Sequence, residues 1–117
     1  MAAPNIVNVT SIYGKTNVAT LSTTTSTVVT NAAASGKVFK VNTILIANMN
    51  GANNAAVNVD VYRSTTSYNV AYLMTVPAGA TLDLMTKSIY LEEGDAIRMT
   101  ASANSHLQGI VSFEELA

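Results

Sequence analysis

Three carboxylates gather in the stretch YLEEGDAIRMT: Glu92, Glu93 and Asp95. General acid–base chemistry needs carboxylates held on opposite sides of a substrate, but adjacent residues of an extended chain point to opposite faces. The spaced Asp/Asn pattern of a calcium-binding loop is missing, and Gly94 indicates a turn. The sequence therefore predicts solvated carboxylates in a turn between two strands, with no metal ion and no catalytic role.

His106 is the single histidine and lies in SANSHLQG, a segment typical of a turn. It has neither a G-x-S-x-G motif to work with nor an Asp close by in the sequence, so a hydrolase triad is not expected. No phosphate-binding glycine motif occurs, and the chain has no Cys for a thiol nucleophile or a thiolate zinc site. We expect an exposed loop histidine, no enzyme activity and no cofactor.

Four tyrosines in the second half of the chain are candidates for binding: Tyr62, Tyr68, Tyr72 and Tyr90. Aromatic rings can stack on sugars, and tyrosine is frequent in protein interfaces. Tyrosines at strand ends also often pack on their own domain. Trp, the usual sugar platform, is missing from the sequence. Contact with protein is therefore favoured, and a glycan-binding or receptor-binding module remains an alternative.

Alternating apolar and polar residues predict strands throughout the chain. In AVNVDVYR, Val57, Val59 and Val61 share one face of a strand. The segments expected to form strands are 37–48, 55–63, 68–76, 81–86, 96–104 and 107–114. Residues 37–48 become apolar on both faces, which indicates a central strand, and Asn50-Gly51 suggests a tight turn that pairs 37–48 with 55–63 as a hairpin.

Turn signals recur about every ten residues, and the connections are too short for crossover helices. Helix signals are weak, because Thr, Val, Asn and Ser dominate. One domain is expected for 117 residues. The fold class predicted is all-β, a single antiparallel β-sandwich of jelly-roll or other Greek-key type.

The first third of the chain is open to two interpretations. One is a pair of ordinary strands, 18–22 and 27–31, joined by a Thr-rich turn. The other is that residues 1–13 form an extended arm that adds to a neighbour's sheet edge, with the sandwich spanning residues 14–117. The N-terminus lacks the basic and apolar regions of a secretory signal, so synthesis in a cytoplasm is expected.

Charged residues make up only 11% of the chain, against about 25% in ordinary soluble domains. The six basic residues are scattered, so no nucleic-acid partner is expected. No apolar run approaches the roughly 18 residues that a membrane span requires. A weakly charged coat does little to keep copies apart, which favours a homo-oligomer or a place among other chains.

Several consecutive words of the sequence resemble a known protein family. They are GKVFKVNTILIAN (36–48), VNVDVY (57–62), IYLEEGDAIRMTASAN (89–104) and SFEEL (112–116). They are similar to small virion structural proteins of tailed bacteriophages, particularly marine ones, over about three-quarters of the chain. Phe113 departs from the pattern, which has Tyr there, and costs a hydroxyl without disturbing the alternation.

The resemblance implies a non-enzymatic virion component that is made in the host cytoplasm and binds the major capsid protein or other virion proteins. A capsid decoration protein is the first expectation, and a neck, tail or fibre-base component is the alternative. It carries no active site to transfer. The residues expected at interfaces are Ile6, Val7, Tyr62, Tyr68, Tyr72, Met74 and Ile110.

Overall fold

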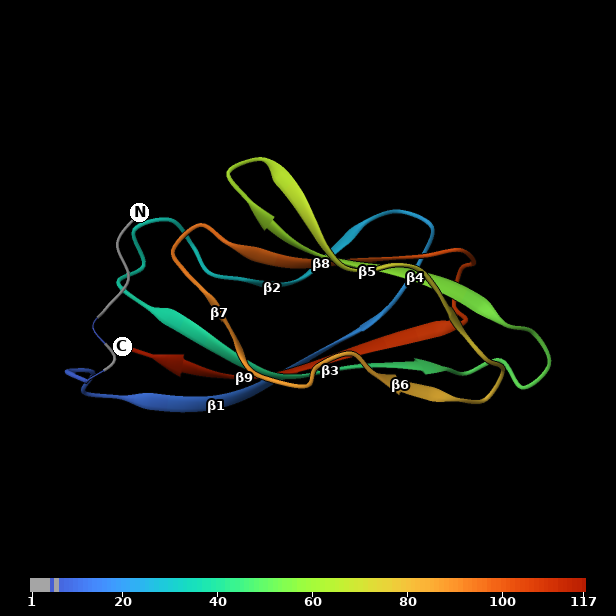
Figure 1. The fold of residues 1–117 in the computed structure, drawn as a ribbon, viewed down its shortest axis with the longest axis horizontal. Helices are drawn as coiled ribbons and strands as arrows, with labels where there is room; N and C mark the ends of the chain where they lie inside the picture. The colour runs from blue at the N-terminus through green and yellow to red at the C-terminus, as the bar shows by residue number, and fades with distance from the viewer. Residues whose placement is uncertain (1–4, 6) are drawn as a thin grey trace.

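Two antiparallel β-sheets packed face to face make up the computed structural model, which describes residue 5 and residues 7–117 (Figure 1). The strands that these residues form are β1 (Ile12–Thr20), β2 (Ser26–Thr30), β3 (Val38–Asn48), β4 (Ala55–Arg63), β5 (Thr66–Val76), β6 (Thr81–Asp83), β7 (Ile89–Leu91), β8 (Ala96–Ala101) and β9 (Leu107–Leu116). Sheet A has the order β1-β9-β3-β6, with β7 also paired to β3, and sheet B has the order β2-β8-β4-β5. The expected β-sandwich is confirmed.

The strand pairs are nested in the sequence. β1 pairs with β9, β2 with β8, β3 with β6 and β7, and β4 with β5, as if one long hairpin were folded over on itself. This nesting produces a jelly-roll arrangement of a five-stranded and a four-stranded sheet, in which β6 and β7 pair with different parts of the same edge of β3. Of the two topologies that the sequence left open, the chain adopts the jelly roll.

The core lies between the sheets and follows the predicted alternation. Val57 and Val59 of β4 lie opposite Ala101 and Met99 of β8, and all four side chains are buried. Gly109 of β9 lies close to this cluster, and a Cβ at this position would require the sulfur of Met99 to shift. The strand predictions for 96–104 and 107–114 are confirmed, with β8 ending at Ala101 and β9 extending to Leu116.

The hairpin predicted between residues 37–48 and 55–63 is wrong, because these segments are β3 of sheet A and β4 of sheet B. The link between them is an arch held by asparagine side chains. Asn48 donates to the carbonyl of Asn53 at 3.0 Å, and Asn50 Oδ1 accepts from the backbone N–H groups of Ala52 and Asn53. The φ angle of Gly51 is not positive, so no tight two-residue turn forms.

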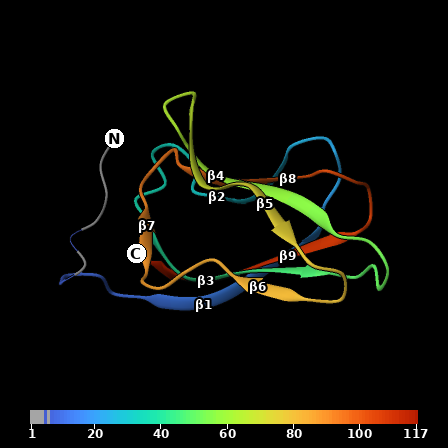
Figure 2. The same ribbon diagram turned by 45° about the vertical axis from the view of Figure 1, so that its right-hand side comes forward.

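The hairpin that does follow β4 is β4–β5, whose turn residues Ser64 and Thr65 both have positive φ angles of 52° and 60°. Such a turn matches the twist of paired strands. The loop stands clear of the rest of the sandwich in both ribbon views (Figures 1 and 2).

The N-terminal region begins its first strand earlier than predicted. β1 starts at Ile12 rather than at residue 18, so Ile12 and Tyr13 of the proposed arm lie in sheet A. Thr10 and Ser11 donate to the carbonyl of Ala117 at 2.7 and 3.0 Å. Residues 1–4 and 6 of the proposed arm lie outside the described residues. The second predicted strand, 27–31, corresponds to β2 (Ser26–Thr30).

Candidate functional site

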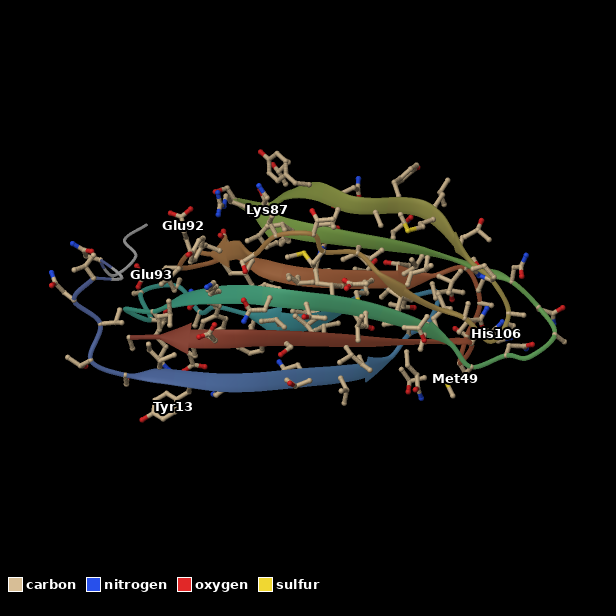
Figure 3. All side chains as sticks on the ribbon, turned by 60° about the horizontal axis from the view of Figure 1, so that its bottom comes forward. Tyr13, Met49, Lys87, Glu92, Glu93 and His106 are labelled. Carbon is tan, nitrogen blue, oxygen red and sulfur yellow. The ribbon has the colours of Figure 1, made fainter. Side chains whose placement is uncertain are left out.

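The acidic turn lies at one end of the sandwich, where Figure 3 shows Glu92 and Glu93. Gly94 has a φ of 86°, as the turn prediction requires. The prediction that all three carboxylates are solvated is wrong, because Asp95 is fully buried and Glu93 is 8% exposed. For Asp95 the physical reason is a basic partner that is distant in the sequence, Arg63 at the end of β4.

Arg63 and Asp95 form a bidentate ion pair. Arg63 Nε donates to Asp95 Oδ1 at 2.9 Å, and Nη2 donates to Oδ2. The guanidinium also lies 3.0 Å from a Glu92 oxygen. The hydrogen bond with Asp95 raises the pKa of Arg63 above its already high ordinary value. The turn therefore binds an arginine of its own chain, which locks β4 of sheet B to the start of β8.

Two further contacts complete this corner. The backbone N–H of Glu92 donates to Asp95 Oδ2 at 2.8 Å, and Glu93 accepts from the N–H of Gly36 at 2.5 Å. Among residues 5 and 7–117, no group of three or more His, Asp or Glu side chains is disposed to hold a metal ion. The carboxylates of Glu93 and Asp95 therefore tie the turn to Gly36 and to Arg63.

His106 lies at the other end of the molecule, near Met49 (Figure 3). The exposed loop histidine of the prediction is instead partly buried. Its Nε2 is 3.3 Å from Asn50 Nδ2, while within the described chain its buried Nδ1 has no hydrogen-bond partner. Asn50 Oδ1 already accepts two backbone N–H groups, so Nδ2 faces the ring and Nε2 is the acceptor. His106 thus links two loops.

Two more groups of ion pairs involve Arg98, Lys15 and Lys37. Arg98 pairs with Asp60 on the adjacent strand at 2.8 Å and stacks over the Tyr62 ring at 3.8 Å. Lys15 and Lys37 both contact Glu115, at 2.9 and 2.6 Å. With Arg63, four of the six basic side chains are held in internal pairs. The described surface is therefore poor in charge available for a partner.

These pairs make stability sensitive to acid. Hydrogen bonds from Lys37 and Lys15 lower the pKa of Glu115 below its ordinary 4.5. Burial alone raises the pKa of Asp60, but hydrogen bonds from Arg98 and Ser67 outweigh it and bring the pKa below 3.8. A depressed folded-state pKa stabilises the fold at pH values above the unfolded-state pKa, and this stabilisation is lost as the pH falls through the folded-state pKa.

We expect Glu115→Gln to lose less stability than the wild type between pH 7 and pH 3. The difference is about 1 kcal/mol, because Lys15 and Lys37 are half-exposed and screened by solvent. Urea unfolding at both pH values measures it. Glu114→Gln is the matched control, since Glu114 is on the same strand and accepts a hydrogen bond from Asn42 at an exposed site. An equal loss in wild type and Glu115→Gln would contradict the assignment.

The predicted interface residues do not form one surface. Ile6 lies outside the described residues, and Val7 is 86% exposed. Tyr62 is half-buried under Arg98, and Ile110 lies half-buried in β9 of the other sheet. Tyr68, Tyr72 and Met74 all belong to β5, but register shifts against β4 lie between them, and Tyr68 and Met74 are opposite the core-facing Val61 and Val57.

The β5 strand is one of the two edges of sheet B and has several exposed apolar side chains. Tyr72 is 67% exposed and Leu73 is 60% exposed. Leu73 and Val70 were not singled out from the sequence, although the run YNVAYLMTV has no charged residue and too many apolar ones for a single buried face. This excess was the available signal. β5 has register shifts against β4, and Leu73 adopts a positive φ of 49° in one of them.

A cleft of about 400 Å³ opens beside β5, between the edges of the two sheets. Its lining residues are Val61, Arg63, Tyr68, Asn69, Val70, Ile89 and Tyr90. Tyr68 and Tyr90 come from opposite sheets and are both partly exposed, at 58% and 44%. The cleft is apolar, with one amide, and its guanidinium is already engaged by Asp95. It therefore suits an uncharged apolar or aromatic group.

A smaller apolar row crosses the outer face of sheet A. Val18, Ile110 and Leu45 lie opposite one another on β1, β9 and β3. Val18 is 71% exposed, and Leu45 and Ile110 are half-buried. The central position predicted for residues 37–48 is confirmed, but nothing in the described chain fully covers their outer face.

Comparisons with known proteins assign no family. No protein-family model matches the sequence, and the search of curated proteins finds no relative. Among the described residues, no helix has the length and apolar character needed to cross a membrane. The geometry shows two features: an acidic corner whose carboxylates contact Arg63 and Gly36, and an apolar, uncharged edge on β5 with a cleft beside it.

Proposed function

We propose that this chain is a non-enzymatic structural protein of a tailed-bacteriophage virion, and in the first place a capsid decoration protein that binds the shell in many copies. The observation that carries a binding role is the β5 edge, where Tyr68, Tyr72 and Leu73 are exposed on a strand without charged residues. The assignment to a virion is supported by the resemblance of residues 36–48 and 89–104 to phage structural proteins.

The fold is compatible with this role without selecting it. Jelly rolls occur in viral capsid domains and in lectins alike, so fold-level analogy alone does not decide between shell binding and glycan binding. The distribution of charge favours protein contact, because four of the six basic side chains form ion pairs with carboxylates of the same chain. A surface with few charges suits repeated packing against other subunits, where many weak contacts add up through effective concentration.

Quantitative mass spectrometry of purified virions of the encoding phage tests the proposal. A decoration protein is expected at a copy number comparable to that of the major capsid protein, and antibody labelling should mark the heads of the particles. A few tens of copies with label at the neck or tail would favour the alternative position in the virion. Failure to find the chain in purified particles would refute the virion assignment.

A further inference from the structure

We propose that Asn50-Gly51 is a site of self-modification, at which Asn50 is converted to isoaspartate, and that the arch between β3 and β4 holds this reaction back until the arch opens. The reacting groups belong to this chain, and water is the co-reactant. The inference does not depend on the virion assignment, so either one can fail while the other holds.

The first observation is the pair of residues itself. Asn50 is the one asparagine of the chain that precedes a glycine. Gly51 is exposed, and it has no Cβ to keep its backbone nitrogen away from the side-chain amide of Asn50. A nucleophile and an electrophile therefore lie next to one another in the chain, with little steric hindrance between them.

The reaction balances with water alone. The backbone nitrogen of Gly51 loses its proton and forms a bond to Cγ of Asn50, the bond between Cγ and Nδ2 breaks, and ammonia leaves with that proton. The cyclic imide that remains is then opened by water. Attack at the former backbone carbonyl gives isoaspartate, whose main chain runs through Cβ and Cγ, and attack at the former side-chain carbonyl gives aspartate. These steps need no oxidant, metal or cofactor.

The second observation is that the folded arch fixes the amide of Asn50. Its Oδ1 accepts from the N–H groups of Ala52 and Asn53 at 2.8 and 2.9 Å. Its Nδ2 lies 3.3 Å from Nε2 of His106, at the end of the molecule where Figure 3 labels the histidine. Ring closure turns the amide toward the nitrogen of Gly51 and makes Cγ tetrahedral. The contacts that hold the amide in place therefore oppose the reaction.

The main chain of Asn50 is anchored as well. Its N–H donates to Oδ1 of Asn48 at 2.9 Å, and its carbonyl accepts from the N–H of Gly79, in the loop between β5 and β6, at 3.0 Å. These bonds fix the peptide groups on both sides of the α-carbon. Attack by a neighbouring nitrogen requires a particular approach geometry. Local opening of the arch is therefore the step that permits the reaction.

The product cannot make the same set of contacts. The nitrogen that faced His106 has left as ammonia, so Nε2 of His106 loses its donor. The additional main-chain atom changes the spacing between the bonds to Asn48 and Gly79. The product also carries a carboxylate, whereas residues 41–59, 64–82 and 99–113 contain no charged side chain. Conversion should thus keep the arch open and give this end of the molecule a negative charge.

Peptide mapping by mass spectrometry tests the site, on the full chain aged in mildly alkaline buffer with and without urea. In urea we expect Asn50 to convert faster than Asn53, which lies in the same arch but precedes Asn54, and to give mainly isoaspartate. In the folded chain we expect the conversion to be slower by roughly tenfold or more, because it waits for the arch to open. Equal rates at Asn50 and Asn53 in urea would overturn the site, and equal rates with and without urea would overturn the role of the arch.

Gly51→Ala is the matched control for the chemistry. A Cβ at Gly51 meets no heavy atom within 4 Å, and the φ angle there is not positive, so alanine fits the folded arch. Its methyl group hinders the attacking nitrogen, and we expect the rate at Asn50 in urea to fall to about that of Asn53. An unchanged rate in Gly51→Ala would contradict attack by this nitrogen.

His106→Ala tests the control by the fold. It removes the contact with Nδ2, so we expect conversion in the folded chain to be faster by roughly threefold or more, with an unchanged rate in urea. Arg98→Met removes an ion pair from the middle of sheet B and should leave the folded-state rate unchanged. A rate in His106→Ala equal to that of the wild type, or an equal increase in both variants, would overturn the assignment. Thermal unfolding checks that both variants are folded.

Hydrogen exchange of the aged wild type gives an independent readout. The converted chain is separated from the unconverted chain by ion exchange, because it carries one more negative charge. We expect the amide of Gly79 to exchange faster in the converted chain, since its acceptor is the carbonyl of Asn50. Unchanged exchange at Gly79 would show that conversion does not keep the arch open, and would overturn that part of the inference.

Discussion

Arg63→Met is expected to lower the free energy of unfolding by about 3–5 kcal/mol, the usual cost of leaving one member of a buried ion pair without its partner. Asp95 is fully buried, and the guanidinium of Arg63 donates one hydrogen bond to each of its two carboxylate oxygens. After the substitution, the N–H of Glu92 is the one donor to the Asp95 side chain that remains among the described residues. Methionine preserves the aliphatic length of arginine, so the loss reports the charge and the hydrogen bonds.

Removal of the other partner, in Asp95→Asn, should lower the free energy of unfolding by less. In Asp95→Asn, the guanidinium is still 3.0 Å from Glu92 and is 37% exposed, so it can be solvated. We expect a loss of about 1–3 kcal/mol, because a removed charged hydrogen bond is partly replaced by water. This inequality follows from the unequal burial of the two partners. Equal costs for the two variants would show that the pair is solvated from both sides.

Arg98→Met is the matched control for Arg63→Met. It also removes an arginine from a cross-strand pair with an aspartate, but Asp60 retains the hydroxyl of Ser67 as a donor. The side chain of Asp60 is also more exposed to solvent than that of Asp95, at 12% against 0%. The expected loss is about 1–2 kcal/mol, as for a hydrogen bond to a charged group that keeps a second partner. Urea unfolding of the three variants at pH 7 gives the ranking.

Much of the fold could be predicted from the sequence, because alternation reports which face of a strand is buried. Val57, Val59, Ile97 and Met99 follow that rule and lie in the core. Alternation does not report which strands pair. The wrong hairpin prediction has this cause. Asn50-Gly51 is typical of a tight turn, but the side chain of Asn48 donates hydrogen bonds to the carbonyls of Asn53 and Val76, and the segment forms an arch between the two sheets.

The candidate site was harder to predict for the same reason. The turn at Gly94 was readable, but the burial of Asp95 depends on Arg63, which is 32 residues away in the chain. Tyr68 and Tyr72 were identified because aromatic residues are conspicuous in a sequence. Their position at a free edge depends on strand order, which periodicity does not encode.

Asn31→Ala is expected to destabilise the fold by about 2–5 kcal/mol, because a buried carbonyl left without its donor costs about 1–3 kcal/mol. Asn31 is fully buried, and its Nδ2 donates to the carbonyls of Lys37 and Leu91 at 2.9 and 3.1 Å. Its Oδ1 accepts from the Ser35 hydroxyl at 2.6 Å. One side chain thus satisfies groups from the ends of three segments.

Two controls separate hydrogen bonding from volume in Asn31. Asn31→Asp keeps the size and the Ser35 contact but turns an oxygen toward two carbonyls, so it should be at least as damaging as alanine. Asn17→Ala removes a single, partly buried bond to Val28 and should cost only about 1 kcal/mol. If Asn31→Asp were as stable as the wild type in urea, the donated bonds would not be what holds this corner. The backbone of Asn31 also forms hydrogen bonds with Gly94 and Asp95. Loss of the Asn31 side chain should therefore loosen the acidic turn as well, and faster hydrogen exchange at the Gly94 amide would detect this.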